Sequence, residues 1–370
     1  MAKIVIPEAL QIVIDDLGWF CGDDDRKSGG ASRTGMPRRH THLDYECIDA
    51  LGRAIGQKIF CAFVVGEWDP DNRLRAISHL SKYGENWDNA RFLCKDEMQK
   101  VVYAINNAEY IDLGVHGINH GYYMEGVDNH DVSDYYYRIN KVRYMVGEEE
   151  IRARLDHFFG LLEYYNINKK VTGMVPPSYA YRIDELSYIL RDYGIKYVST
   201  PFRLLKDERY KYIHIENSGI ITIDRQKDVL DWYEYNADYD VLPEKCGHYG
   251  AHWPNFLHID PKRNMEIVSK AVKYFKRCAD NIGCIISKDM RFAVTQSLYY
   301  KYAEITEGVG GTTAINLTKV PEHNEINGVF YVNSEQPITE YQGCEIKEYC
   351  RKKGFISYEI KPFEKTVLLK

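Results

Sequence analysis

The chain has 370 residues, a hydrophobic content of 45% and a formal net charge of −6. This composition is ordinary for a globular protein with a large core, and the mild negative charge gives no support for nucleic-acid binding. No stretch approaches the roughly twenty apolar residues of a membrane span, no signal-peptide pattern opens the chain, and the nine cysteines include no CxxC pair. We therefore expect a cytoplasmic protein without a membrane span, a zinc ribbon or a disulfide framework.

Strand-like and helix-like segments alternate along most of the chain. Apolar, strand-like runs fall near residues 9–14, 58–65, 111–115, 171–175, 195–199 and 219–224. Helical periodicity falls near residues 43–56, 95–108, 147–165, 182–193 and 262–279. This alternation predicts an α/β fold, with a parallel sheet wrapped by helices. In barrels of this kind the active site lies at the carboxyl ends of the strands.

The last 70 residues have a different pattern. Three segments alternate polar and apolar residues with turn residues between them, namely 310–317, 328–332 and 355–360. Such alternation predicts a small antiparallel β appendage. We expect two units, a barrel over residues 1–299 and a β-rich region over residues 300–370. Capping the barrel is the favoured role of this region, and carbohydrate binding and oligomer contact are the alternatives.

Two of the strand-like runs end in side chains that bind metal or move protons. The run Ile-Val-Ile-Asp-Asp ends in Asp15 and Asp16, and the run Leu-Gly-Val-His-Gly-Ile-Asn-His carries His116 and His120. Each fragment alone is common as a turn, a helix cap or a helical surface pair, but here both follow strands. Adjacent carboxylates at a strand end point in different directions, so one can bind a cation while the other stays free as a base. Together with two histidines they form a set that holds a divalent metal with open positions.

These fragments, in this order, resemble the motifs of the polysaccharide deacetylases of the NodB-homology type, carbohydrate esterase family 4. The resemblance covers roughly residues 8–290. It implies an irregular (β/α)7 barrel that removes an N-acetyl or O-acetyl group from a sugar or glycan. It also implies that Asp15 is the general base and that Asp16, His116 and His120 bind one divalent ion, zinc before cobalt, nickel or manganese.

A third family motif can be placed on the run Val-Pro-Pro-Ser-Tyr that begins at Val175. The resemblance implies that a backbone N–H near Ser178 and Tyr179 faces the developing oxyanion. The family has an arginine where this chain has Val175, and that arginine holds the catalytic base. Arg203 and Arg225 are the candidates to replace it.

Two further motifs are matched more loosely. The run Asp-Val-Leu-Asp-Trp, which ends in Asp231 and Trp232, resembles the fourth motif at a longer spacing than the family shows. The last motif supplies a histidine that protonates the leaving amine, and the candidates are His252 and His258. We favour His252, because a tryptophan and a turn follow it directly.

Glu67 and Trp68 follow the second predicted strand and are candidate sugar-binding residues. A carboxylate beside an indole suits a sugar, with Trp68 as the stacking platform. The 31 tyrosines give weak support to the same idea.

A long polar segment, residues 20–42, follows the aspartate pair. Loops of this length inside a domain are commonly functional. Arg38, Arg39 and His40 are placed to reach a phosphate or carboxylate on a substrate, and a solvated surface loop is the equal alternative.

The sequence therefore predicts a metal-dependent deacetylase, which hydrolyses a linear amide C–N bond of a sugar or oligosaccharide. Two other classes stay open. A non-catalytic carbohydrate-binding barrel is permitted by Val175, and a metal-dependent hydrolase of a non-sugar C–N bond fits the same architecture.

Overall fold

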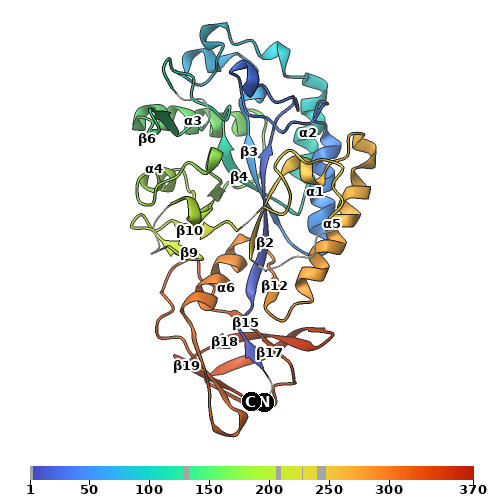
Figure 1. Ribbon diagram of the computed structural model, residues 1–370, viewed down its shortest axis with the longest axis vertical. Coiled ribbons are helices and arrows are strands. Elements are labelled where there is room, and N and C mark those ends of the chain that lie inside the picture. The colour runs from blue at the N-terminus through green and yellow to red at the C-terminus, as the bar shows by residue number, and fades with distance from the viewer. Residues whose placement is uncertain (1–2, 128–132, 206–209, 227, 240–246) are drawn as a thin grey trace.

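A curled, mostly parallel sheet organises the larger part of the molecule (Figure 1). The computed structural model describes residues 3–127, 133–205, 210–226, 228–239 and 247–370. The sheet has the order β11-β2-β3-β4-β7-β8-β10-β9, and β12 also pairs with β2. Its strands are β2 (Glu8–Leu17), β3 (Ile59–Val64), β4 (Ile111–Gly117), β7 (Gly173–Met174), β8 (Tyr197–Thr200), β9 (Ile213–Ile215), β10 (Ile221–Asp224), β11 (His248–His252) and β12 (Cys284–Ile286). All of these pairings are parallel except that of β9 with β10.

The two ends of the sheet approach each other beyond β10. The N–H of Gln226 donates to the carbonyl of His248 at 3.0 Å, and the N–H of Val229 donates to that of Gly250 at 2.9 Å. The chain that follows β10 therefore runs beside β11, which lies at the opposite end of the strand order. The prediction of an α/β fold with a barrel-like sheet is confirmed at this level.

In the described ranges, six α-helices surround the sheet: α1 (His42–Ile55), α2 (Lys95–Asn107), α3 (Glu148–Tyr164), α4 (Ser187–Asp192), α5 (Asn264–Ala279) and α6 (Met290–Tyr302). Helix α1 packs between α2 and α5 on one side of the molecule (Figure 1). Each of these three helices buries one apolar stripe, which is why its periodicity is visible in the sequence. Within the described part of the chain, we find no helix that combines the length and apolar character needed to cross a bilayer.

The sequence did not predict α6 or β11. Helix α6 is buried almost all round from Met290 to Tyr299, so it lacks the polar face that gives a helical period. Strand β11 reads His-Tyr-Gly-Ala-His and has no apolar run, although most of it is buried. In both segments the tertiary environment outweighs local pattern.

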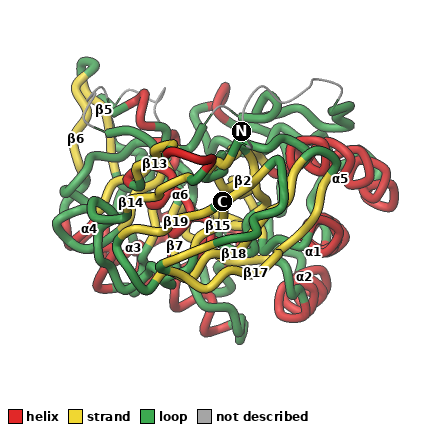
Figure 2. The backbone as a smooth tube through the Cα atoms, turned by 90° about the horizontal axis from the view of Figure 1, so that it is seen from below, coloured by secondary structure: helices red, strands yellow, loops and turns green. Residues whose placement is uncertain are grey.

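The C-terminal residues form two four-stranded antiparallel sheets at the end of the molecule that carries both termini (Figures 1 and 2). One sheet contains β1 (Ile4–Val5), β15 (Phe330–Ser334), β18 (Phe355–Pro362) and β17 (Cys344–Lys352). The other contains β13 (Glu304–Glu307), β14 (Thr313–Asn316), β19 (Thr366–Leu369) and β16 (Tyr341–Gln342). The boundary expected at residue 299 falls inside α6, where the Tyr299 ring stacks on Phe330 with centroids 4.4 Å apart. Strand β1 also comes from outside residues 300–370, so the division into two units stays a prediction.

A buried polar network fixes the end of the segment 20–42. The guanidinium of Arg38 donates to both carboxylate oxygens of Asp44, at 2.7 and 2.8 Å. His40 Nδ1 lies 3.2 Å from the same carboxylate, and Asn264 of α5 donates to it at 2.7 Å. Arg39 contacts the carbonyl of Phe92. The expectation that Arg38 and His40 bind a substrate anion is therefore wrong, because both already bind Asp44.

We expect Asp44→Asn to lower the free energy of unfolding by about 1–3 kcal/mol at pH 7, since the partly buried guanidinium of Arg38 loses its charged acceptor. Burial disfavours ionisation of Asp44, but hydrogen bonds from His40 and Arg38 outweigh it and hold the pKa of this carboxyl below its usual range. A depressed pKa stabilises the fold above the unfolded-state value, so the difference between the two proteins should shrink as the pH falls below about 4. Urea unfolding of the wild type and the Asp44→Asn variant at several pH values measures this difference in stability. An unchanged unfolding midpoint at pH 7 would refute the stabilising role of Asp44.

Candidate functional site

A local distortion of β2 separates the two aspartates. Its pairing with β3 shifts register between Ile14 and Leu17, on either side of Asp15 and Asp16. Asp16 has φ +67°, in the left-handed region that residues other than glycine rarely adopt. Bulges of this kind re-aim side chains next to active sites. Asp15 and Asp16 accordingly have different partners.

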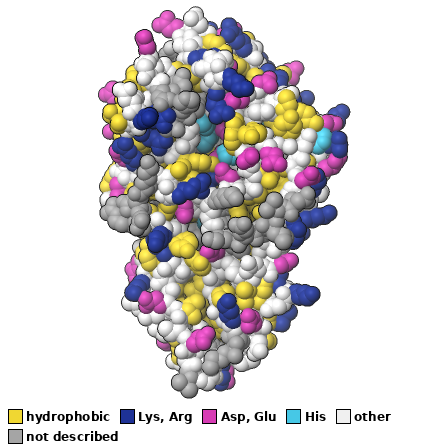
Figure 3. Space-filling view, viewed as in Figure 1, with side chains coloured by type: hydrophobic (Ala, Val, Ile, Leu, Met, Phe, Trp, Pro, Cys, Tyr) yellow, Lys and Arg dark blue, Asp and Glu magenta, His cyan; other side chains and the backbone are white. Residues whose placement is uncertain are grey.

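Asp16 lies with two histidines in a buried cluster. Asp16 Oδ1 is 3.6 Å from His116 Nε2 and 4.0 Å from His120 Nε2. One ligand atom from each of the three residues lies within 4.8 Å of the other two. His120 has φ +45°, so two of the three residues hold strained backbone conformations, and such strain concentrates at functional sites. Figure 3, which has the same view as Figure 1, shows histidine side chains in a hollow of the surface.

The ring of His116 is oriented by a backbone carbonyl. His116 Nδ1 lies 2.7 Å from the carbonyl oxygen of Val175. A carbonyl only accepts, so Nδ1 carries the proton and the lone pair of Nε2 faces Asp16. Metal-ligating histidines typically have such a partner on the other ring nitrogen.

The turn that carries His120 is held by Asp134, a buried residue that the sequence analysis did not single out. Asp134 Oδ1 accepts hydrogen bonds from the N–H groups of Ile118 at 3.3 Å and Asn119 at 3.0 Å. Gly117 lets the chain approach, because a Cβ there would lie 2.1 Å from Asp134 Oδ2. Asp134 stands in no recognisable motif, so only the fold relates it to the HxxxH fragment.

The cluster suits a cation. Burial and the neighbouring Asp15 raise the pKa of Asp16 to about 8, and burial lowers the pKa values of His116 and His120 to about 3. Within the described part of the chain, Asp16 Oδ1 has no hydrogen-bond partner although it is buried, which is rare in folded proteins. Ligand atoms bound to one ion at about 2.1 Å are separated by roughly 3–3.5 Å, close to the spacing found here. The residues therefore fit a divalent metal.

Arg225 holds the second aspartate. Its Nη1 donates to Asp15 Oδ1 at 2.6 Å, and both side chains are buried. On its other side, Arg225 contacts Asp228 Oδ1 at 3.2 Å. Burial raises the pKa of Asp15, and the positive charge of Arg225 opposes that rise. Of the two candidates to replace the arginine missing at Val175, the structure places Arg225 at the site, whereas Arg203 is exposed.

His252 lies beside Asp15 because the parallel pairing of β11 with β2 places these two residues opposite each other. Its Nε2 is 3.8 Å from Asp15 Oδ2. Burial lowers the pKa of His252, and Asp15 partly offsets this effect. Trp232 meets the His252 ring edge-on at 6.4 Å, and Arg26 Cζ lies 4.4 Å from the Trp232 ring. Arg26 belongs to the polar segment 20–42, so that segment does reach the site, through a residue that the sequence did not single out.

Three predicted site residues have structural partners instead. Trp68 is fully buried and its Nε1 donates to the carbonyl of Gly18 at 2.7 Å, so no sugar can stack on it here. Glu67 is also fully buried and accepts from the backbone of Phe20 and from Arg33 at 2.7 and 2.8 Å. The prediction that these two residues bind a sugar is wrong in this structure. The backbone N–H of His258 donates to Asn264 Oδ1 at 2.8 Å, and His258 Nδ1 accepts from the N–H of Asp260, so these contacts lie outside the cluster.

The third and fourth motifs line the site less directly. Ser178 and Tyr179 both have positive φ, and the Tyr179 ring lies 5.0 Å from Arg225 Cζ. The N–H of Tyr179 donates to the carbonyl of Pro176 at 2.9 Å, so it is already used inside the turn. Asp231 is exposed, and its carbonyl accepts from Asn255.

Gly250 on β11 makes room for Arg225. A Cβ at this position would lie 2.2 Å from Arg225 Nε and 2.0 Å from Asp228 Oδ1. We expect Gly250→Ala to displace the guanidinium and lower turnover roughly 10- to 100-fold, because catalytic groups tolerate little misplacement. Gly160 in α3 is the matched control, since a Cβ there meets nothing within 4 Å. Steady-state kinetics of both alanine variants check this, and equal rates would contradict the role of Gly250.

Comparison with known proteins gives weak similarities. No family model matches the chain, and no curated protein matches it by sequence. A provisionally named polysaccharide deacetylase from Mycobacterium smegmatis is 10% identical, with a TM-score of 0.38 over 66% of this chain and 73% of that one. A 4-α-glucanotransferase from Thermococcus litoralis is 12% identical, with a TM-score of 0.39 over 75% of this chain and 39% of that one. A GH57-type branching enzyme from Pyrococcus horikoshii is 13% identical, with a TM-score of 0.39 over 75% and 60%. These values are too low to assign a family.

Proposed function

We propose that the chain is a metal-dependent hydrolase that removes an N-acetyl or O-acetyl group from a sugar or glycan. One observation carries this proposal. The buried set of Asp16, His116 and His120 lies next to a second carboxylate, Asp15, which Arg225 holds separately. A metal-ligand set with an adjacent free base is the arrangement that hydrolysis of an acyl group requires.

The proposal includes the finer architecture. Eight strands of the curled sheet pair in parallel: seven follow one another along the strand order, namely β11, β2, β3, β4, β7, β8 and β10, and the eighth, β12, pairs with β2 off this path. Together with the hydrogen bonds between the chain after β10 and β11, this supports an irregular (β/α)7 barrel. The candidate groups lie at the carboxyl ends of its strands, where such barrels carry their active sites.

In the proposed mechanism, Asp16, His116 and His120 would hold the divalent ion, which would supply Lewis-acid activation of water and of the acyl carbonyl. Asp15 Oδ2 accepts the proton of the attacking water, while Arg225 fixes the orientation of the carboxylate through Oδ1. His252 Nε2, 3.8 Å from Asp15, donates a proton to the departing nitrogen or oxygen. Because Asp15 and His252 lie so close together, the proton that Asp15 takes from water can pass through His252 to the leaving group.

Arg225 bears on the choice between an enzyme and a binding protein. The family that the chain resembles has an arginine that orients the base, and this chain has Val175 at that position. The absence of that arginine was the reason to consider a barrel without activity. Arg225 makes the equivalent contact from the end of β10, so the base keeps a cationic partner. This favours the enzyme.

The test is acetate release from N-acetylated chito-oligosaccharides and, in parallel, from simple N-acetyl amides. We expect release from the sugars, its loss after treatment with a chelator, and its recovery when zinc or cobalt is restored. Release from the simple amides alone would indicate a hydrolase of non-sugar C–N bonds. No release from any acetylated compound by the metal-loaded protein would overturn the proposal in favour of a binding barrel.

A further inference from the structure

The two histidines of the cluster differ in how their rings are held. His116 Nδ1 lies 2.7 Å from the carbonyl oxygen of Val175, so this ring is fixed from outside the cluster. His120 Nδ1 is buried, and within the described ranges it has no hydrogen-bond partner on another residue. Histidines that bind a metal almost always have such a partner on the second ring nitrogen. The position of the His120 ring therefore depends on its own backbone, which has φ +45°.

The backbone turn that precedes His120 is held from two sides. On one side, the chain that follows β3 donates two backbone N–H groups to the carbonyls of Gly117 and Ile118, at 3.3 and 2.6 Å. On the other side, Asp134 Oδ1 accepts from the N–H groups of Ile118 and Asn119, at 3.3 and 3.0 Å. The first pair of bonds joins backbone atoms, so no change of side-chain chemistry removes it. The second pair depends on a single carboxylate.

Asp134 is closely confined. It is fully buried just before a two-stranded hairpin, β5 (Tyr136–Ile139) and β6 (Val142–Met145). A Cβ at Gly117 would lie 2.1 Å from Asp134 Oδ2 and 2.9 Å from its Cγ. Burial raises the pKa of Asp134 to about 6, and the N–H groups of the turn and the charge of Arg154, on α3, oppose that rise. The fold therefore places this carboxylate against the turn and compensates its burial.

We propose that Asp134 is a positioning residue for the metal site, because it holds the turn so that His120 Nε2 faces Asp16 Oδ1, 4.0 Å away. This inference rests on the proposed function for the presence of the metal. Without Asp134, two buried N–H groups lose their acceptor, and the turn can regain partners only by moving. A displaced His120 leaves Asp16 and His116 as the protein ligands in place, so metal affinity should fall although Asp134 does not belong to the ligand set.

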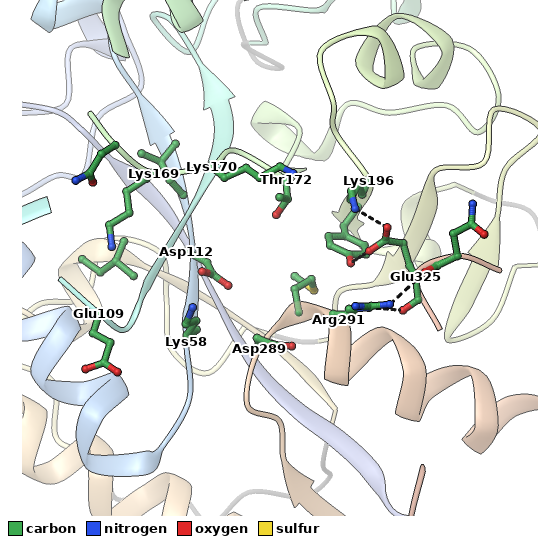
Figure 4. Close-up of a pocket in the computed structure, with 16 residues that line it drawn as sticks. Lys58, Glu109, Asp112, Lys169, Lys170, Thr172, Lys196, Asp289, Arg291 and Glu325 are labelled. Atoms are coloured by element: carbon green, nitrogen blue, oxygen red, sulfur yellow. Dashed lines mark hydrogen bonds and ion pairs between the residues drawn. The ribbon is translucent and has the colours of Figure 1, made fainter. Parts of the chain in front are cut away.

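Two other aspartates provide matched controls. Asp69 is also fully buried and also accepts two backbone N–H groups, from Leu74 at 2.9 Å and from Asp71 at 3.3 Å, but its turn carries no member of the cluster. Asp112 lies on β4, the strand of His116, at the opposite end. It lines a cavity of about 560 Å³ that contains charges of both signs (Figure 4). The first control reproduces the loss of a buried turn contact, and the second reproduces the loss of a carboxylate from the same strand.

The experiment measures the dissociation constant for zinc by competition with a chromogenic chelator, and the visible absorption spectrum after loading with cobalt. Asp134→Ala should bind zinc ~10- to 100-fold more weakly and alter the cobalt spectrum. Asp134→Asn keeps an acceptor oxygen and should stay within ~5-fold of the wild type. Asp69→Ala and Asp112→Ala should keep the wild-type affinity and spectrum. Urea unfolding of each protein shows which effects are losses of stability alone.

Gly117→Ala tests the same contact from the other side. The Cβ that it adds meets the Asp134 carboxylate, so this substitution should also weaken zinc binding. In the Asp134→Ala background the carboxylate is gone, and Gly117→Ala should add no further loss. If Asp134→Ala does not fold, Gly117→Ala and Asp134→Asn carry the test.

Wild-type zinc affinity in both Asp134→Ala and Gly117→Ala, or a loss that Asp69→Ala matches, would overturn the proposal. Acetate release is recorded on the same metal-loaded samples. Weaker zinc binding in the Asp134 variant, together with no release by the wild type, rejects the proposed function and keeps the role of Asp134. Release by the wild type, with unchanged zinc affinity in the variants, does the reverse. A wild type that binds no zinc rejects both.

Discussion

Asp15→Asn is expected to lower kcat for acetate release by roughly 10²- to 10⁴-fold while the bound metal is retained. The amide has nearly the volume of the carboxylate and keeps an oxygen that can accept from Arg225 Nη1, so the packing of this buried pair changes little. It cannot accept a proton from water, which is the role assigned to Oδ2. The metal-ligand set of Asp16, His116 and His120 is untouched.

Asp228→Asn is the matched control for this substitution. Asp228 contacts the same guanidinium as Asp15, but its side chain is 26% exposed and it lies on the far side of Arg225. Replacement of the Asp228 carboxylate should lower kcat by less than ~10-fold, because Asp15 remains in place as the base. Full activity of the Asp15→Asn protein with a normal metal content would sink the assignment of Asp15 as the base.

Arg225→Met is expected to lower both stability and activity. Arg225 and Asp15 form a fully buried ion pair, and removal of one partner leaves an uncompensated charge in the interior. Such substitutions cost about 3–5 kcal/mol of unfolding free energy. Without the guanidinium, burial favours the protonated form of Asp15, which cannot act as a base, so kcat should fall with the stability.

Arg203→Met separates the role of Arg225 from the general loss of a cation. Arg203 is exposed and also follows a strand of the same sheet, so its replacement should change stability by less than ~0.5 kcal/mol. Urea unfolding and acetate release are measured on both variants. If the two methionine variants behave alike, Arg225 does not support the base.

Local pattern predicted the elements that show a clear helical period or a continuous apolar run. Helix α1 was expected over 43–56 and spans His42–Ile55, and the strand expected over 58–65 is β3, Ile59–Val64. The same approach could not find α6 or β11, because α6 has no polar face and β11 has no apolar run. The N-terminal strand β1 pairs with β15, a contact between residues more than 300 positions apart that no local period encodes.

The candidate site was predictable where its chemistry is contiguous in the chain. Asp15 and Asp16 are adjacent and His116 and His120 are four residues apart, so each fragment is visible before any fold is known. The contact of Arg225 with Asp15 joins residues 210 positions apart, and sequence alone could not choose it over Arg203.

Burial explains the errors. An exposed and a fully buried Trp-Glu pair look identical in a sequence. In this fold Glu67 accepts from Phe20 at the start of the segment 20–42, and Trp68 donates to Gly18 just before it, so neither side chain is left to face a ligand. Asp134 was missed for the converse reason. Its importance comes from two backbone N–H groups that only the folded turn brings to it.

The metal content of the purified protein tests the central claim most directly. Elemental mass spectrometry is applied to the wild type, to Asp16→Ala/His116→Ala, and to His258→Ala as the control histidine outside the cluster. The account predicts about one divalent ion per chain in the wild type and the control, and its loss in the double variant. A wild type that binds no ion even after addition of zinc or cobalt, or a double variant that keeps the ion, would contradict it.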